Sequence, residues 1–231
     1  MDIKGPNLVK GIHLEGLRVL GKPEDFAQFY YEQGADELIY QDTVASLYQR
    51  NNLTEIVKRT VENIFIPLTV GGGIRTLEDI KIALRAGADK VSINTAAINN
   101  PNLIDQASKA FGSSTIVLAI EAIKQNNGSY LAYTDNGREH TGVEVSTWAK
   151  EVENRGAGEI LITSIDNEGT GRGYDLDLVK LVSDDVKIPV IAHGGCGRFD
   201  HVFEVLNFSK ADAVALASSL HYSSLNQQLV G

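Results

Sequence analysis

Acidic side chains follow several apolar runs of this 231-residue sequence, at the points where the runs end. Glu121 comes directly after the apolar run Thr115 to Ile120, and Asp2 follows the short stub of a first strand. Two carboxylates that reach one substrate from opposite sides can act as general acid and general base. Asp2 and Glu121 are therefore the candidate catalytic pair, although a frayed terminal residue and a solvated loop charge remain an open alternative. The other carboxylates in such positions are Asp42, Asp166 and Glu168.

A triple glycine follows the apolar run Leu68 to Val70. Glycines at 71 to 73 allow a tight turn in which bare backbone N–H groups can approach an anion. A second apolar run, Val91 to Ile93, ends on the same side when a helix crosses over between the two strands. The sequence thus predicts a phosphate site at this end, formed by the glycines together with Asn94 and Thr95.

The helix between these two strands has clear signals at both ends. Thr76 is the expected N-cap, and Glu78 and Asp79 in the first turn suit the helix dipole. Gly87 is expected to end the helix after Ala86. The segment therefore predicts a parallel strand–helix–strand unit.

A similar pattern recurs between Ile188 and Leu220. It repeats the Ile-Pro opening, a double glycine at 194 and 195, an Ala-Asp before the last strand and a hydroxyl residue after it. The segment before each copy also repeats, because Gly34 to Asp42 resembles Gly156 to Asp166. We expect an internally duplicated β/α array with two phosphate sites, although a purely structural turn is the common alternative for any one glycine pair.

Composition narrows the class of protein. A chain with 43% hydrophobic residues and alternating strands and helices is expected to form one domain over residues 1–231. A net charge of −9 without a basic cluster argues against nucleic-acid binding. No apolar run approaches the roughly 18 residues of a membrane span, and the single cysteine, Cys196, suits a cytoplasmic protein. The scattered histidines predict no metal site, and no cofactor motif is recognised.

The number of strands predicts the fold class. Seven strands are expected near residues 38, 68, 91, 117, 161, 190 and 214, and a stub at Met1 makes eight. We therefore predict an α/β protein with the (β/α)8 TIM-barrel fold, an internal twofold half-barrel duplication and a truncated first strand. In that fold the reactive groups lie at the carboxyl ends of the strands, and strands one and five face each other. The prediction places Asp2 opposite Glu121.

Several motifs resemble the family of the cyclase subunit of imidazole glycerol phosphate synthase (HisF), and the resemblance covers nearly the whole chain. They are D-I-K-G-P-N-L-V-K-G, Q-D-T-V-A-S, T-V-G-G-G-I, K-V-S-I-N-T-A-A and G-A-G-E-I-L-I-T-S-I-D followed by E-G-T. The related isomerase of the same pathway shares G-G-G-I-R, but S-I-N-T-A-A and L-I-T-S-I-D-N-E-G-T favour the cyclase.

The resemblance implies an enzyme of histidine biosynthesis that works with a partner glutaminase. Ammonia released by the glutaminase would pass through the barrel to a ribulosyl-aminoimidazole substrate with two phosphates. By position, the resemblance makes Asp2 and Glu121 catalytic. It gives a substrate or phosphate contact to Lys10, Gly73, Asn94, Thr95, Thr163, Glu168, Gly169, Gly195, Ala217 and Ser218. A ring of charges at the ammonia entrance would include Glu37, Lys90 and Glu159.

Three residues depart from the family pattern inside the expected site. Glu121 and Glu168 each replace an aspartate, and His193 stands where the family has a small residue. One alternative is therefore a HisF-like paralogue that uses the same ammonia chemistry to form an amidino group on a sugar for surface polysaccharide. Another alternative is a catalytically inactive subunit that activates the glutaminase.

Overall fold

The computed structural model describes residues 1–45 and 53–228. Clustering of contacts divides the chain into two compact units. Unit 1 consists of Met1–Val9, Arg18–Leu118 and Arg155–Gly158, and unit 2 of Lys10–Leu17, Ala119–Asn154 and Glu159–Gly231. The expectation of a single domain over the whole chain stays a prediction.

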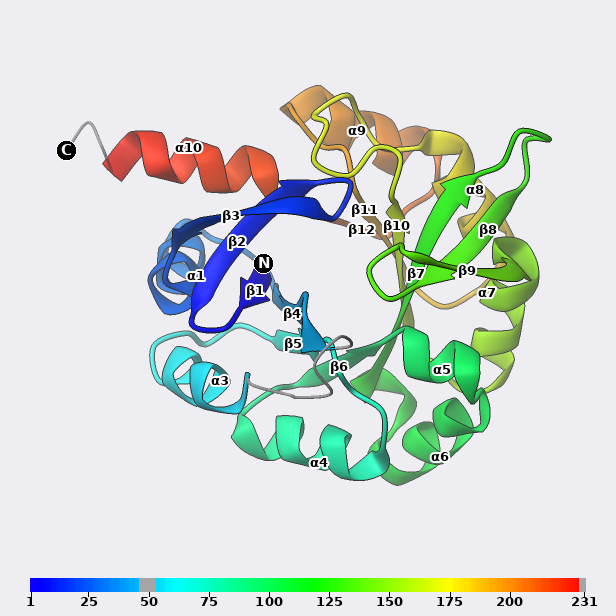
Figure 1. The fold of residues 1–231 in the computed structure, drawn as a ribbon, viewed down its shortest axis with the longest axis horizontal. Helices are drawn as coiled ribbons and strands as arrows, with labels where there is room; N and C mark the ends of the chain where they lie inside the picture. Colours follow the sequence, from blue (N-terminus) through cyan, green and yellow to red (C-terminus); the bar gives the residue numbers. More distant parts are fainter. Residues whose placement is uncertain (46–52, 229–231) are drawn as a thin grey trace. The chain divides into compact units, whose positions relative to one another are not determined.

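Strands and helices alternate along most of the chain (Figure 1). The strands are β1 (Asp2–Lys4), β2 (Asn7–Ile12), β3 (Glu15–Gly21), β4 (Leu38–Asp42), β5 (Leu68–Gly71), β6 (Lys90–Ile93), β7 (Ile116–Lys124), β8 (Tyr130–Thr134), β9 (Glu139–Glu144), β10 (Glu159–Ser164), β11 (Val190–His193) and β12 (Ala213–Ala215). The helices are α1 (Pro23–Glu32), α3 (Thr54–Val61), α4 (Leu77–Ala86), α5 (Thr95–Asn99), α6 (Asn102–Phe111), α7 (Val145–Asn154), α8 (Leu176–Asp185), α9 (Phe199–Phe208) and α10 (Ser218–Gln228), with a short 3-10 turn η1 (Ser113–Thr115).

Unit 1 is built on parallel strands in the order β1, β4, β5, β6 and the first part of β7. Leu68, Val91 and Ile93 on these strands are almost completely buried. Helices α1, α3, α4 and α6 pack against one another in succession, and Figure 1 shows α3, α4 and α6 outside strands β4 to β6. The carboxyl ends of the strands, where the site residues are expected, therefore all lie at one edge of the sheet.

Unit 2 repeats this arrangement with β10, β11 and β12 in parallel. Helices α7, α8 and α9 pack in the same successive way. An antiparallel hairpin, β8 and β9, is added to the end of β7. Ile120, Ile160 and Ile162 are completely buried and form part of the core of unit 2.

The repeat extends to the hydrogen bonds at the strand starts. In unit 1, Asp89 accepts a hydrogen bond from the Leu68 backbone N–H at 2.8 Å. In unit 2, Asp212 accepts one from the Val190 backbone N–H at 2.9 Å. The same short polar side chain therefore fixes the start of the glycine-turn strand in both halves, which supports the predicted duplication.

The helix signals around α4 are confirmed. Thr76 accepts a hydrogen bond from the Asp79 backbone N–H at 3.1 Å, while the Asp79 carboxylate accepts one from the Thr76 backbone N–H at 2.9 Å. These reciprocal bonds form a capping box, which satisfies two N–H groups that the helix leaves without partners. Gly87 ends the helix in the left-handed conformation, with φ of 115°.

Two features differ from the sequence expectation or were missed by it. The first strand, expected only as a stub at Met1, is the three-residue β1, and an additional β2–β3 hairpin follows it. Strand β7 continues to Lys124 and pairs with β8, so Glu121 lies within the strand and opposite Tyr133 instead of at its end. In both places an antiparallel partner, β2 on β1 and β8 on β7, is added to the parallel sheet.

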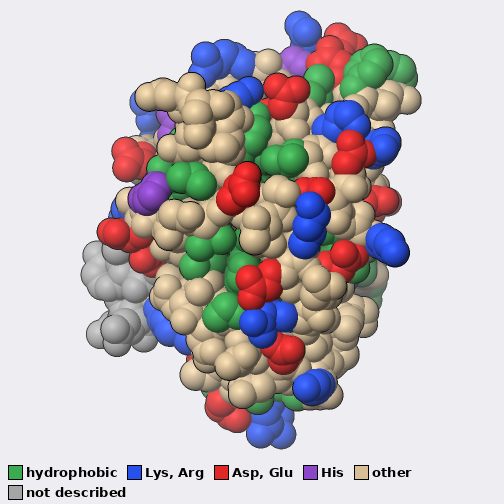
Figure 2. Space-filling model, turned by 90° about the vertical axis from the view of Figure 1, so that its right-hand side faces the viewer, with side chains coloured by type: hydrophobic (Ala, Val, Ile, Leu, Met, Phe, Trp, Pro, Cys, Tyr) green, Lys and Arg blue, Asp and Glu red, His purple; other side chains and the backbone are tan. Residues whose placement is uncertain are grey.

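Charges on the surface are mixed in sign. On the face that Figure 2 shows, acidic and basic side chains alternate without a large cluster of one kind among the described residues. Within the part of the chain that the structure describes, no helix is long and apolar enough to span a bilayer. Among the same residues, no group of three or more histidine, cysteine or acidic side chains is placed to hold a metal ion.

Candidate phosphate-binding and catalytic site

The triple glycine of unit 1 turns tightly at the end of β5. Gly72 and Gly73 have positive φ angles of 88° and 74°. A Cβ on Gly72 would lie 2.3 Å from the carbonyl oxygen of Asp42, so the backbones of neighbouring strands approach closely here. Asn94 and Thr95 follow the adjacent strand β6 and begin α5. The expected parts of the first phosphate site, the glycines with Asn94 and Thr95, thus follow two adjacent parallel strands.

The glycine pair of unit 2 makes an equivalent turn after β11. Gly194 and Gly195 have φ angles of 93° and 105°. A Cβ on Gly194 would lie 2.7 Å from the carbonyl oxygen of Ser164, and one on Gly195 would lie 2.0 Å from that of Gly173. Neither position has room for a side chain, which explains why glycine is required at both.

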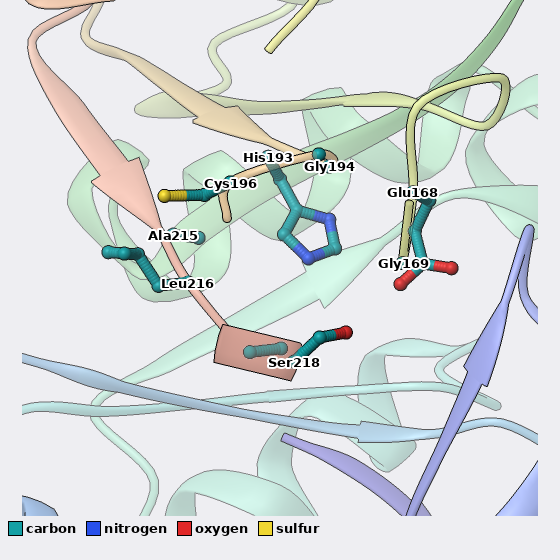
Figure 3. A pocket seen from close by; sticks show the side chains of 10 residues that line it. Glu168, Gly169, His193, Gly194, Cys196, Ala215, Leu216 and Ser218 are labelled. Carbon is teal, nitrogen blue, oxygen red and sulfur yellow. The ribbon is translucent and has the colours of Figure 1, made fainter. Parts of the chain in front are cut away.

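A small pocket that is partly open to solvent adjoins this second turn. Figure 3 shows it between the turn, the loop that carries Glu168 and the start of α10. Its lining brings together four residues expected at the second phosphate site and adds others from the same elements. The lining residues are Glu168, Gly169, His193, Gly194, Gly195, Cys196, Ala215, Leu216, Ala217 and Ser218.

His193 contributes an imidazole ring to this pocket. Its Nδ1 lies 3.0 Å from the hydroxyl oxygen of Thr163 on the neighbouring strand β10. The two residues are directly paired in the parallel sheet. The sequence singles out both positions but does not predict their hydrogen bond, because that bond depends on the parallel register of β10 and β11.

Lys10 and Glu168 form a buried ion pair in unit 2. Both side chains are almost completely buried, and Lys10 Nζ contacts Glu168 Oε1. The other carboxylate oxygen accepts a hydrogen bond from the Leu14 backbone N–H at 2.9 Å, and the Glu168 carbonyl accepts one from the His13 N–H at 3.0 Å. A buried charge needs such partners, because an unpaired one would carry a large desolvation cost. Glu168 therefore attaches the β2–β3 loop to the loop after β10.

The candidate catalytic carboxylates occupy different environments in their own units. Asp2 is half-buried in β1, where it pairs with Val9 and Gln41. Glu121 is 8% exposed in β7, and its Oε2 accepts a hydrogen bond from the Gly137 backbone N–H at 2.8 Å. A buried carboxylate with a fixed orientation is suited to proton transfer. The solvated-loop alternative for Glu121 is therefore wrong.

The other two acidic candidates have evident local structural contacts. Asp42 accepts a hydrogen bond from the Val44 backbone N–H at 3.0 Å, as a turn-forming aspartate does. Asp166 accepts one from the Lys124 backbone N–H at 2.9 Å and so connects the loop after β10 to the end of β7.

Two of the three residues expected at the ammonia entrance are joined in unit 1. Lys90 Nζ lies 3.1 Å from Glu37 Oε2, and each residue stands at the amino end of a strand. Glu159 is the first residue of β10 in unit 2. Stabilising ion pairs at the strand starts would look the same, so their role stays a prediction.

Cys196 follows the second turn, and its sulfur points away from the His193 ring in Figure 3. Burial raises the pKa of the Cys196 thiol above its ordinary value. Burial likewise raises the pKa of the neighbouring Tyr174, with the Cys196 charge as the next cause. Since the thiolate is the nucleophilic form, this cysteine is suited to filling space and not to attack.

Comparison with known proteins identifies the family. A family model described as a histidine biosynthesis protein matches residues 1–226. An imidazole glycerol phosphate synthase subunit HisF from Legionella pneumophila is 64% identical over 200 residues, which cover 87% of this chain and 94% of that protein. The chain belongs to the HisF family. Other HisF proteins are 48% identical in Trichormus variabilis (98% of this chain, 89% of the relative) and 49% identical in Methanocaldococcus jannaschii (96% and 89%).

The family assignment confirms the predicted fold and activity class. HisF proteins have the (β/α)8 barrel, and the parallel strands and alternating helices of both units agree with it. The same relatives support an enzyme of the lyase type, the cyclase subunit of imidazole glycerol phosphate synthase in histidine biosynthesis.

Proposed function

We propose that this HisF family member converts a bis-phosphorylated ribulosyl-aminoimidazole into imidazole glycerol phosphate and an aminoimidazole carboxamide ribotide. The ammonia for this reaction comes from a partner glutaminase of the HisH type, and the reaction takes place in the cytoplasm. The observation that carries the proposal is the pair of equivalent glycine turns, one in each unit, of which the second opens on a pocket. A substrate with two phosphates calls for two anion-binding turns of this kind.

Each turn would bind its phosphate mainly through backbone N–H groups. In unit 1 the residues that would bind the phosphate are Gly73, Asn94 and Thr95. In unit 2 they are Gly169, Gly195, Ala217 and Ser218. Glycines with positive φ expose N–H groups that no side chain covers, and the first turns of α5 and α10 add further N–H donors.

Asp2 and Glu121 would act as the acid and base of ring closure and cleavage. The Gly137 N–H fixes the orientation of Glu121, so its carboxylate can take up and return a proton at a fixed place. Thr163 would contact the substrate from β10. Lys10 and Glu168 would contact it from the buried ion pair.

Ammonia would enter past Glu37, Lys90 and Glu159. Inside unit 1, the Oε1 of Gln41 and the Oγ of Ser92 are buried and have no hydrogen-bond partner among the described residues. Buried polar atoms without partners suit a small guest that can donate hydrogen bonds, as ammonia can.

The direct test is an assay of the purified chain with the ribulosyl substrate at high ammonium concentration, which replaces the glutaminase. We expect the substrate to be consumed and imidazole glycerol phosphate to appear. The control is the same assay without ammonium, in which the product should not form. Absence of product at saturating ammonium, from protein that still binds inorganic phosphate, would contradict the cyclase proposal.

Glu121 variants separate catalysis from binding. Glu121→Gln keeps the shape but cannot exchange a proton, so kcat should fall by roughly 10²-fold while KM changes little. Asp166→Asn is the matched control, because Asp166 is another carboxylate with a backbone partner, and its kcat should stay within about threefold of the unaltered enzyme. Unchanged turnover in Glu121→Gln would remove Glu121 from the chemistry.

A second candidate function is formation of an amidino group on a nucleotide-linked sugar with the same ammonia route. The longer Glu168 and the His193 ring within the second pocket favour it, because both alter the space that the substrate enters. Turnover of such a sugar at high ammonium, with no turnover of the ribulosyl substrate, would support this candidate over the first.

A further inference from the structure

The position before the double glycine differs most between the two turns. In unit 1 this position is Gly71, and the side-chain oxygen of Gln41 on the paired strand position lies 2.0 Å from where a Cβ would be. In unit 2 it is His193, and its paired position carries the shorter Thr163. The larger side chain is therefore on the first strand of the pair in unit 1, as Gln41, and on the second strand in unit 2, as His193. An imidazole thus occupies the space that an amide fills in unit 1.

The contact with Thr163 defines how the His193 ring presents its nitrogens. In the charged ring both nitrogens carry protons, so Nδ1–H donates to the Thr163 hydroxyl and the second N–H is on Nε2. Figure 3 shows the ring pointing from β11 into the pocket, between Glu168 and Ser218. The Nε2–H therefore belongs to the pocket side of the ring.

Besides His193, the pocket lining contains two titratable side chains, Glu168 and Cys196. Glu168, on the loop after β10, faces the ring, and its carboxylate is already bound by Lys10 and the Leu14 N–H. Cys196 lies on the turn itself with its sulfur turned away, and α10 contributes only the neutral Ser218. The pocket therefore adds to its backbone N–H groups one ring that can become a cation.

We propose that His193 is a binding residue of this chain which donates its Nε2–H to a phosphate monoester in the second pocket. The inference rests on the proposed function, in which that pocket takes one of the two substrate phosphates. It adds that recognition at this end depends on the protonation of His193, while the equivalent turn of unit 1 has no ionisable side chain at the same position. Thr163 acts as a positioning residue for the ring.

The sign of the pH dependence follows from linkage. A bound phosphate favours the charged imidazole, so the added affinity is present below the pKa of the free ring and is lost as the pH rises through the pKa in the complex. The phosphate also gains charge as the pH rises, but it does so equally for every variant. The ratio of affinities between the unaltered protein and a variant isolates the imidazole.

The test uses inorganic phosphate as the probe and measures its Kd at pH 6 and pH 8 in NMR titrations that follow the backbone amides of Gly195 and Ser218, which line the pocket in both proteins. The resonance of His193 is the one absent from the His193→Gln spectrum. The Gln variant keeps a neutral donor near the Nε2 position and is the matched control. We expect Kd in His193→Gln to exceed that of the unaltered protein by roughly 10-fold at pH 6 and by about twofold at pH 8. Equal ratios at both pH values would overturn the proposal.

A second variant tests the positioning role of Thr163. Thr163→Val has nearly the same shape but cannot form the hydrogen bond with Nδ1, so the nitrogen shifts of His193 should show a mixture of ring tautomers. The phosphate Kd should rise by roughly threefold, and it should not rise in the double variant with His193→Gln. An unchanged tautomer in Thr163→Val would overturn this part.

The same titration distinguishes failure of this inference from failure of the proposed function. Phosphate that binds tightly without any effect of His193, in protein that still turns over the ribulosyl substrate, contradicts only the inference. Phosphate binding that depends on His193 in protein without cyclase turnover contradicts only the proposed reaction.

Discussion

The two glycine turns have the same backbone and different surroundings. Both place a glycine with positive φ against the backbone of a neighbouring strand, at Gly72 in unit 1 and at Gly194 in unit 2. In both units an aspartate, Asp89 or Asp212, also accepts a hydrogen bond from a backbone N–H at the start of the strand that leads into the turn. The side chains before the glycines are unrelated in size and charge. Steric exclusion thus defines the turn in each half, while the adjoining side chain is free to define what the turn recognises.

The largest expected effect is on stability and comes from Gly72→Ala. The added Cβ would lie 2.3 Å from the Asp42 backbone oxygen. The alanine would also have to adopt a φ near 88°, a conformation that L residues rarely adopt. We expect the free energy of unfolding to fall by about 3 kcal/mol or more in urea denaturation. Gly34→Ala is the matched control, because Gly34 has the same φ of 88° with open space around it, and should lose only about 1 kcal/mol. Equal losses would show that the close approach is not responsible.

Gly194→Ala should have a smaller effect in the same measurement. Its Cβ would lie 2.7 Å from the Ser164 oxygen, which requires less movement than at Gly72, and a loss of about 2 kcal/mol is expected. The control in unit 2 is Gly128→Ala, where φ is 86° and no atom lies within 4 Å. A larger loss of unfolding free energy in Gly194→Ala than in Gly72→Ala would contradict the expectation that the turn of unit 1 is the more tightly packed one.

The exchange of large and small side chains can be tested by a double-mutant cycle in unit 1. Gly71→Ala should destabilise by about 2 kcal/mol, because its Cβ meets Gln41 Oε1 at 2.0 Å and Ser92 Cβ at 2.9 Å. Gln41→Thr, which copies the Thr163 of unit 2, should restore about half of this loss when combined with Gly71→Ala. Additive losses in the double variant would mean that the Gln41 side chain does not limit the space.

The next smaller effect on stability is expected from the two equivalent aspartates, Asp89 and Asp212. Asp89→Ala and Asp212→Ala each remove one hydrogen bond to a strand N–H, and each should cost about 1 kcal/mol of unfolding free energy. The two costs should agree within about 0.5 kcal/mol, because the contacts are equivalent. A clear difference between them would show that the duplication does not extend to energetics.

The smallest effect is expected at Cys196, which stands where unit 1 has the buried Ile74. Cys196→Val should change stability by less than about 1 kcal/mol and leave cyclase turnover intact. Because burial raises the thiol pKa, alkylation by iodoacetamide should be slower than for a free thiol at pH 8 and should increase as the pH rises. Rapid alkylation at pH 7 would contradict the assignment of a space-filling role.

Sequence patterns predicted the parts of the fold that local rules determine. The N-cap at Thr76, the end of α4 at Gly87 and the positions of the parallel strands follow from capping, turn and periodicity rules. The β2–β3 hairpin was missed because its residues lack a clear alternation, and its attachment depends on Glu168, far along the chain. Pairing of this kind has no local signal.

The sequence predicted which residues form the candidate site better than it predicted the contacts between them. The lining of the second pocket includes Glu168, Gly169, Gly195, Ala217 and Ser218 as expected. The hydrogen bond between Thr163 and His193 and the close packing of Gly195 required the register of the strands. For the same reason a bulky substitution at Gly195 is not a clean test of phosphate binding, because a Cβ there would already lie 2.0 Å from the Gly173 oxygen and would disturb the fold.

The buried pair of Lys10 and Glu168 has a consequence for biosynthesis of the protein. The two residues are separated by 158 positions, so Lys10 is made long before its partner. At about 5 to 20 residues per second, Glu168 follows roughly 8 to 32 s later. During that interval the ammonium group has to remain in water, and the segment around it cannot adopt its final place. Translation speed up to the loop after β10 therefore sets the earliest time at which the beginning of the chain can complete its folding.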